Sequence, residues 1–279
     1  MRTSTKRFLQ LSTIVGALAL ASTPASAIVT NWDYTVSSLF TFATYSGSGG
    51  STATLPTSTL HWGIPTVTGG LQSSLAVGSS PISGNVDTYI GSSVPPQTAP
   101  YLGFSTSLTH NNHVIQSGST SLLTAVLTNT VTLDPTNPDM PALSNLSIPF
   151  EIAFTETSNT AGTCAAASPA NNPCNDIFVL TSGLLNQTFD FDDGSGLSTY
   201  YVNIFPATGG VLATLSDSAC AAAGQSSGCL GFTTEEGLST TLQFGFTIST
   251  NPLQIPEPGM LGLLGLGLAG LSLLRRKAV

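Results

Sequence analysis

The sequence predicts an all-β protein, an antiparallel β-sandwich of the jelly-roll-like kind, flanked by an N-terminal signal helix and a C-terminal transmembrane helix. Three observations predict it. Apolar and polar residues alternate in many short runs, clusters of Gly, Pro, Asn and Ser separate these runs, and the strong helix formers Lys, Arg and Glu are nearly absent between the two ends of the chain. The expected segments are a signal peptide at 1–27, a β domain at 28–253 and a C-terminal segment at 254–279.

The first segment has the features of a secretory signal. A basic start, MRTSTKR, precedes an apolar run that ends near Ala21, and Ala25-Ser26-Ala27 offers the small residues that signal peptidase requires. We therefore expect export by the Sec machinery and cleavage by signal peptidase, with the mature chain starting near Ile28. An uncleaved amphipathic helix is the alternative.

The middle segment is the length of one domain, and roughly ten strands are expected in it. In LQFGFTI, for example, Leu242, Phe244, Phe246 and Ile248 fall on one face of a strand. Two Ser- and Gly-rich stretches, YSGSGGSTATLPTST (45–59) and VGSSPISGN (77–85), are expected as surface loops. The clearest strand runs in chain order are LLTAVLTNTVTL (122–133), IPFEIAF (148–154), DIFVLT (176–181), TYYVNIF (199–205), VLATL (211–215) and LQFGFTI (242–248).

Charge is distributed unevenly along the chain. All 6 Lys and Arg residues lie at the two ends, outside 8–274, whereas all but one of the 14 acidic residues lie between Asp33 and Glu236. A domain with no basic residue has nothing to neutralise phosphates, which excludes nucleic acid as a partner. The charge favours binding of cations or solubility through self-repulsion.

The 4 cysteines form two close pairs along the sequence, Cys164 with Cys174 and Cys220 with Cys229. Because an exported chain meets an oxidising compartment, each pair is predicted to form a disulfide that closes a short loop. A zinc site would require tighter C-x-x-C pairs.

The few histidines draw attention to one stretch, LGFSTSLTHNNHVIQ, which holds His110 and His113; the remaining histidine is His61. On a continuous strand His110 points to the apolar face, whereas Thr109 and Asn111 point outward. A structural histidine at the edge of the core, a metal or ligand site formed with His113, and a general base are the three open interpretations. The residues of that run that share the parity of His110 are Leu102, Phe104, Thr106 and Leu108.

A second candidate site is the acidic turn DFDDGSG, which contains Asp190, Asp192 and Asp193. Carboxylates so close together repel unless a cation or water separates them, so calcium is the one cofactor to consider here. The spacing departs from the EF-hand pattern, and Tyr201 stands where that loop needs its closing Glu. A solvated turn is the alternative.

The C-terminal segment is apolar from Gly259 to Leu274 apart from Ser272, and it ends in Arg275, Arg276 and Lys277. As a helix at about 1.5 Å per residue it spans about 24 Å, close to a bilayer core when the ends snorkel. The positive-inside rule keeps the basic end in the cytoplasm and the preceding domain outside. A buried globular helix is the alternative.

Pro256-Glu257-Pro258, the apolar span and the basic end at 275–277 together resemble the PEP-CTERM sorting signal of Gram-negative bacteria. The resemblance implies an exosortase as the processing partner, a transient anchor in the inner membrane, and transfer to the cell surface or extracellular matrix. Thr109-His110-Asn111-Asn112 is similar to the signature of the THxN family of PEP-CTERM proteins, a resemblance that supplies no activity.

Enzyme function is not expected. The β domain has no HExxH or phosphate-binding glycine loop, and Glu235 and Glu236 are adjacent, which on a strand places them on opposite faces. A polar turn is the expected setting of these two glutamates. The predicted function is a non-enzymatic structural or adhesive protein of an exopolysaccharide or biofilm matrix. The alternatives are a secreted hydrolase and a Ca²⁺-assisted carbohydrate-binding module whose sugar-stacking residues would be Trp32, Trp62, Tyr200 and Tyr201.

Overall fold

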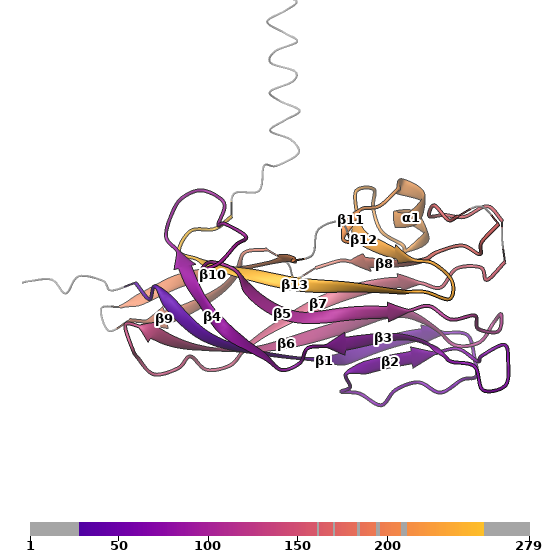
Figure 1. The fold of residues 1–279 in the computed structure, drawn as a ribbon, viewed down its shortest axis with the longest axis horizontal. Helices are drawn as coiled ribbons and strands as arrows, with labels where there is room; N and C mark the ends of the chain where they lie inside the picture. The colour runs from indigo at the N-terminus through magenta and orange to yellow at the C-terminus, as the bar shows by residue number, and fades with distance from the viewer. Residues whose placement is uncertain are drawn as a thin grey trace, which may run out of the picture.

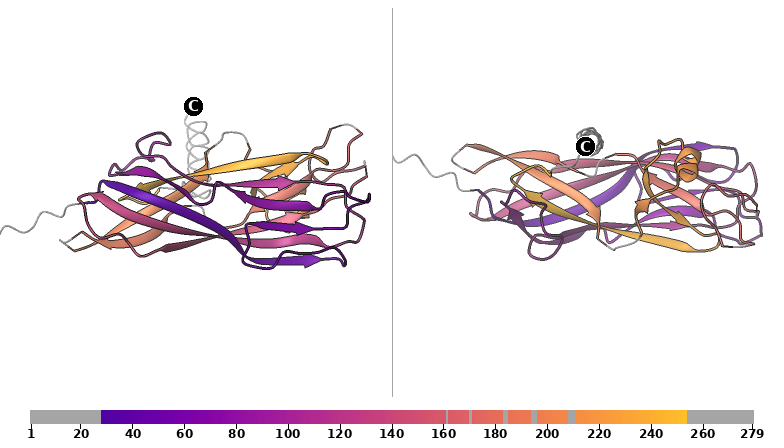
Figure 2. Two further views of the ribbon diagram at one scale, coloured as in Figure 1. Left: turned by 60° about the horizontal axis from the view of Figure 1, so that its bottom comes forward. Right: turned by 90° about the horizontal axis from the view of Figure 1, so that it is seen from above.

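The structure is a computed structural model that describes residues 28–160, 162–169, 171–182, 185–193, 196–207 and 211–253. The described residues form an elongated, almost entirely β molecule whose strands run mostly along its long axis (Figures 1 and 2). One short helix, α1 (Asp217–Ala222), lies near one end. The strands are β1 (Asn31–Ser46), β2 (Thr59–Trp62), β3 (Ser73–Gly78), β4 (Ile82–Tyr89), β5 (Gly103–Asn111), β6 (Ser121–Asn137), β7 (Leu146–Thr155), β8 (Asp176–Leu180), β9 (Gln187–Asp192), β10 (Leu197–Pro206), β11 (Ala213–Thr214), β12 (Leu230–Thr234) and β13 (Ser239–Ser249).

The all-β prediction is confirmed, but the described strands form one continuous 13-stranded sheet, where two separate sheets were expected. Its main order is β11-β12-β8-β7-β6-β1-β4-β13-β5-β3-β2, and β10 pairs with β13 and β9. Strand β4 joins the two halves, because it pairs antiparallel with β1 and, through Thr88 and Tyr89, parallel with β13.

The sheet curls so that its two halves enclose a common core. β1 and β6 are 16 and 17 residues long, and their pairing contains register shifts at Asn31/Trp32, Phe40/Phe42 and Thr44/Tyr45. Such bulges bend a strand and increase its twist. Phe150 of β7 consequently packs on Phe244 of β13, with 5.5 Å between the ring centroids, although the two strands belong to opposite halves of the sheet.

The two ends of the described chain lie at the same end of the molecule. Asn31 at the start of β1 pairs with Asp87, and Ser249 at the end of β13 pairs with Tyr89, two residues further along β4. The other end of β13, Ser239, pairs with Asn111 at the end of β5. The Thr109–Asn112 stretch is therefore at the opposite end, together with β2, β3, β8 and β12 (Figure 1).

Both predicted disulfides are present, Cys164–Cys174 and Cys220–Cys229. They hold the loops and helix α1 that cover the outer face of β8, where Ile177 and Val179 form a small second core with Ala153, Ala166 and Ala219. By the chain-entropy model, each short loop of about ten residues contributes on the order of 2 to 3 kcal/mol.

Some boundaries differ from the expectation. VGSSPISGN, expected as a loop, contributes to β3 and β4 instead, and only two residues of VLATL form a strand, β11. Among the described residues, no helix is long and apolar enough to cross a membrane. The signal helix predicted within 1–27 and the transmembrane helix predicted at 259–274 lie outside the described residues.

Candidate functional site

Several strands end in a polar residue on their inward face at the end of the molecule that holds Thr109–Asn112. The inward residues of β5 include Leu108 and His110, both 0% exposed, and Asn112 follows them inside. On β7 the inward series Phe150, Ile152, Phe154 continues to Glu156, and on β8 Asp176 shares the inward face with Phe178 and Leu180. Glu236 lies in the turn between β12 and β13. We call His110, Glu156, Asp176 and Glu236 the buried acidic centre.

Aromatic rings fix the position of His110. The His110 imidazole stacks on Trp62 at 5.9 Å between centroids and meets the edge of Phe154 at 4.9 Å. Its Nε2 lies 3.8 Å from Asp176 Oδ2, and the Trp62 indole N–H donates a hydrogen bond of 2.8 Å to Glu156 Oε2. Trp62 thus contacts both His110 and Glu156, which come from different halves of the sheet.

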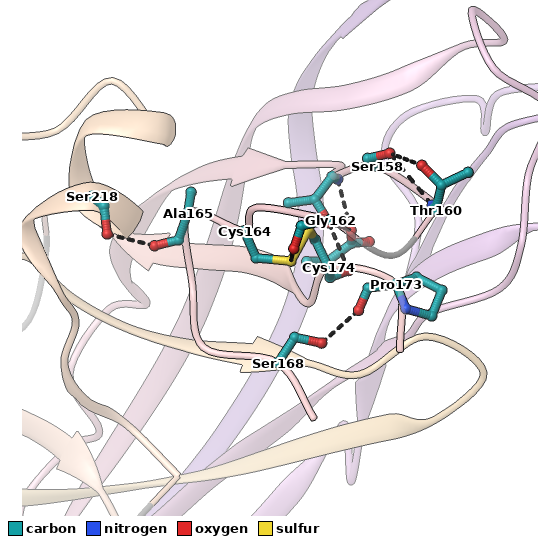
Figure 3. The surroundings of a disulfide bond; sticks show 11 residues. Ser158, Thr160, Gly162, Cys164, Ala165, Ser168, Pro173, Cys174 and Ser218 are labelled. Atoms are coloured by element: carbon teal, nitrogen blue, oxygen red, sulfur yellow. Dashed lines mark hydrogen bonds between the residues drawn. A yellow bond between two sulfur atoms is a disulfide. The ribbon is translucent and has the colours of Figure 1, made fainter. Parts of the chain in front are cut away.

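The chain next to the first disulfide holds Asp176. Asp176 Oδ1 accepts hydrogen bonds from the Thr157 backbone N–H at 2.8 Å and from the Thr157 hydroxyl at 3.2 Å. That hydroxyl also donates to the Cys174 carbonyl at 2.7 Å, and the Cys174 N–H donates to the Ser158 carbonyl at 3.2 Å (Figure 3). The Cys164–Cys174 disulfide therefore anchors the segment that enters β8 at Asp176.

Burial changes the protonation of the whole centre. It lowers the pKa of His110 to about 3, with a smaller effect from the charge of His113, so the imidazole is neutral at pH 7 and its contact with Asp176 is not an ion pair. Burial raises the pKa of Glu156 to about 7; the bond from Trp62 opposes this shift and the charge of Glu236 adds to it. Burial and the charge of Glu156 raise the pKa of Asp176.

Glu156 and Asp176 act as one titrating pair. The charge of Glu156 raises the pKa of Asp176, and the Asp176 side chain lowers the pKa of Glu156. The titration of one group therefore depends on the other, and the pKa values belong to the pair. Burial also raises the pKa of Glu236, and the nearby Gly237 backbone N–H opposes this shift.

The outward residues of the same stretch form a polar surface. The Thr109 hydroxyl lies 2.9 Å from that of Thr241, and Asn111 donates to Ser74 Oγ at 3.0 Å. A hollow of about 560 Å³ beside them is lined by His61, His113, Asn111, Gln72, Ser74 and Thr59 together with Gly70 and Leu71. The prediction that His110 faces inward and Thr109 and Asn111 outward is confirmed, which separates His110 from the surface on which His61 and His113 lie.

The acidic turn is built differently from the expectation of three clustered carboxylates. Asp190 and Asp192 are exposed, whereas Asp193 is buried. The Thr199 hydroxyl donates to Asp190 at 2.6 Å, and the Ser198 hydroxyl donates to Asp193 at 3.1 Å. Within the described ranges, no group of three or more His, Cys, Asp or Glu side chains is arranged to hold a metal ion.

The aromatic residues considered for sugar stacking are mostly inaccessible. Trp32, Trp62 and Tyr200 are each 0% exposed, and only Tyr201 is partly exposed. Trp32 packs edge-on against Phe189, Phe191 and Tyr200 in the core at the other end of the molecule. The interpretation of Trp32, Trp62 and Tyr200 as sugar-binding surfaces is therefore wrong, because their rings fill the core.

Sequence reasoning missed Glu156 and Asp176. A usable signal was present, since each continues the period-two alternation of its strand by one inward step. Glu235 and Glu236 do lie in the predicted turn, but both carboxylate oxygens of Glu236 are buried. Nothing in the sequence indicates that this turn meets Glu156 and Asp176.

The sorting-signal residues Pro256, Glu257, Pro258, Arg275, Arg276 and Lys277 lie outside the described residues. Comparison with known families shows that residues 254–277 match the PEP-CTERM protein-sorting motif. Comparison with curated proteins finds no match. The match does not reach Thr109–Asn112, so membership of the THxN family stays a prediction. The motif implies an exported protein that an exosortase processes at the membrane, and the two disulfides suggest an extracytoplasmic location.

Proposed function

We propose that this chain is a non-enzymatic protein of the cell surface or extracellular matrix of a Gram-negative bacterium, with a structural or adhesive role in an exopolysaccharide or biofilm matrix. The observation that carries the proposal is the PEP-CTERM motif at 254–277. After Sec-dependent export and signal peptide removal, the C-terminal segment anchors the chain transiently in the inner membrane, and the exosortase then processes it near Pro256-Glu257-Pro258.

The fold supports this proposal in two ways. Strand β13 ends at Ser249, at the end of the molecule opposite to the polar hollow beside Asn111. The His110 and Asp176 side chains are at most 1% exposed, which keeps a macromolecular substrate from reaching either. An absence of Lys and Arg from 8–274 also fits a matrix protein that interacts through hydroxyl and amide groups.

Replacing Pro256, Glu257 and Pro258 by alanine is expected to abolish processing, because the two prolines keep this segment extended and accessible. Cell fractionation should find the variant in the inner membrane, and the amount recovered from the matrix should fall at least about tenfold. Attached biomass should fall in the same strain. A conservative control, Arg275→Lys, keeps the basic end and should be processed normally. Unchanged matrix recovery of the triple variant would refute the proposed route.

A second candidate function, carbohydrate binding, is favoured by the polar hollow of about 560 Å³ beside Asn111. Its imidazole, amide and hydroxyl groups are those that bind sugar hydroxyls. On a glycan array, His61→Ala with His113→Ala should lose any signal that the wild-type protein gives, whereas the distant Asp190→Asn should keep it. No wild-type signal would eliminate this candidate and leave the structural role.

A further inference from the structure

The buried acidic centre has no positively charged partner anywhere in the domain. Positions 8–274 contain no Lys or Arg, and burial keeps the one adjacent base, His110, neutral. Buried carboxylates are costly unless they are paired, protonated or bound to a metal. Compensation for Glu156, Asp176 and Glu236 must therefore come from solvent, as protons or as a cation.

Most of the buried polar atoms at the centre that lack a hydrogen-bond partner are oxygens, and the exceptions are the two ring nitrogens of His110. They include Glu156 Oε1, Asp176 Oδ2 and both carboxylate oxygens of Glu236. Two amide oxygens in the neighbourhood share this property: Asn159 Oδ1, three residues beyond Glu156, and Asn112 Oδ1, whose own side chain donates to the Thr234 carbonyl at the start of the Glu236 turn. A proton on one carboxyl group supplies a single hydrogen-bond donor. Several oxygens close together instead suit a hard cation, which takes oxygen ligands.

A path from solvent leads to this centre. Glu156 and Asn159 line a hollow of about 550 Å³, and most of its other residues carry hydroxyl groups. These residues include Ser46, Ser117, Ser119, Ser121, Thr157, Ser158 and Thr160. Behind Glu156, the side chains of Asp176 and His110 are almost completely buried. His110 Nε2 lies 3.8 Å from Asp176 Oδ2. The hollow thus brings solvent up to Glu156, the residue through which an ion would enter the centre.

We propose that the Glu156–Asp176 pair binds a divalent, oxygen-seeking cation of the calcium type that enters through this hollow. Two carboxylates and the uncharged oxygens around them form the site, which is compatible with the lack of any three preformed His, Cys, Asp or Glu ligands in the described residues. His110 and Trp62 position the pair. The site is distinct from the acidic turn at Asp190, which lies at the other end of the molecule, and it does not depend on the proposed matrix role.

The two tryptophans make the location measurable. Trp62 donates to Glu156, whereas Trp32 packs against Phe189 and Phe191, on either side of Asp190 in β9. Tb³⁺ is an oxygen-seeking stand-in for Ca²⁺ whose emission is sensitised by a nearby excited indole. With the full chain in solution, Trp32→Phe should keep tryptophan-sensitised Tb³⁺ emission and Trp62→Phe should lose most of it. The reverse result would place the ion at the acidic turn and overturn the proposal.

Thermal unfolding tests the ligands themselves. In the EDTA-treated and dialysed full chain, CaCl2 about a hundredfold above its Kd should raise Tm by about 5 to 10 °C. Glu156→Gln and Asp176→Asn are isosteric, and both should lose this rise and weaken Ca²⁺ binding in calorimetry at least about tenfold. Glu151→Gln, at an exposed position of the same strand β7, is the matched control and should keep the full rise.

Circular dichroism must show that the two variants keep the β fold without calcium. Should either fail to fold, calcium titration of the wild-type and of Asp190→Asn with Asp192→Asn decides instead. A rise in Tm that the turn variant keeps supports the buried site. A rise that the turn variant loses, or no calcium effect on the wild-type, would overturn the proposal.

Discussion

Trp62→Ala is expected to lower the free energy of unfolding by about 4 to 5 kcal/mol. Trp62 is 0% exposed and packs on His110 and Phe154, so truncation removes a large buried surface and leaves a cavity, which typically costs about 3 to 5 kcal/mol. It also removes the donor to Glu156 Oε2. Urea unfolding monitored by circular dichroism measures the loss.

A matched variant separates the two effects. Trp62→Phe keeps an aromatic ring between His110 and Phe154 but has no N–H, so it should cost about 2 kcal/mol, mainly from the lost bond to a buried carboxyl group. A loss below about 1 kcal/mol for Trp62→Ala would contradict the packing of Trp62 between β5 and β7. Equal losses for the alanine and phenylalanine variants would show that the hydrogen bond, and not the ring, carries the effect.

Relative to Glu156→Gln, the wild-type protein is expected to lose about 3 kcal/mol of stability between pH 4.5 and pH 8 in the presence of EDTA. The pKa of Glu156 is about 7 in the folded state, whereas it is 4.5 in the unfolded chain. As the pH rises, the unfolded chain releases its proton first, so the folded state is favoured at low pH. This contribution is fully present below about pH 4.5 and is lost as the pH rises through about 7.

The comparison with a variant is needed because His110 has the opposite effect. Its folded-state pKa of about 3 lies below the usual 6.5, so its contribution is present above pH 6.5 and is lost as the pH falls toward 3. Above pH 6.5 the imidazole is neutral in both states, and the raised pKa of Asp176 makes total stability fall further. Urea midpoints at several pH values measure the difference. The control Glu151→Gln should follow the wild-type curve. If the wild-type protein instead became more stable relative to Glu156→Gln as the pH rises, this result would contradict the described centre.

The strands were predictable where one face is apolar throughout. The alternation in β7 and β13 matches the inward series Phe150, Ile152, Phe154 and Phe244, Phe246, Ile248. Alternation failed near Phe104, which is 44% exposed although it shares the parity of His110. The reason is a register shift between β5 and β13, where Gln243 pairs with Ser107 but Gly245 pairs with Phe104, so the parity changes within the strand.

The candidate site was only half predictable. The alternation that includes Leu108 predicted that His110 faces inward, and the cysteine spacing predicted both disulfides. The encounter of Glu156, Asp176 and Glu236 depends on three strand ends far apart in sequence, and no local pattern encodes it. Acidic residues are usually exposed, so an inward Glu156 and Asp176 contradict the residue preference even though they obey the alternation. Such local conflicts are expected at functional sites.

Intact mass spectrometry of the protein recovered from its own cells, with and without reduction, tests export and sorting most directly. The expected mass corresponds to a chain from Ile28 to a point near Pro256-Glu257-Pro258, and reduction should add about two hydrogen masses for each disulfide. A mass that still includes Leu261 to Val279 would contradict exosortase processing and show that the C-terminal segment is retained.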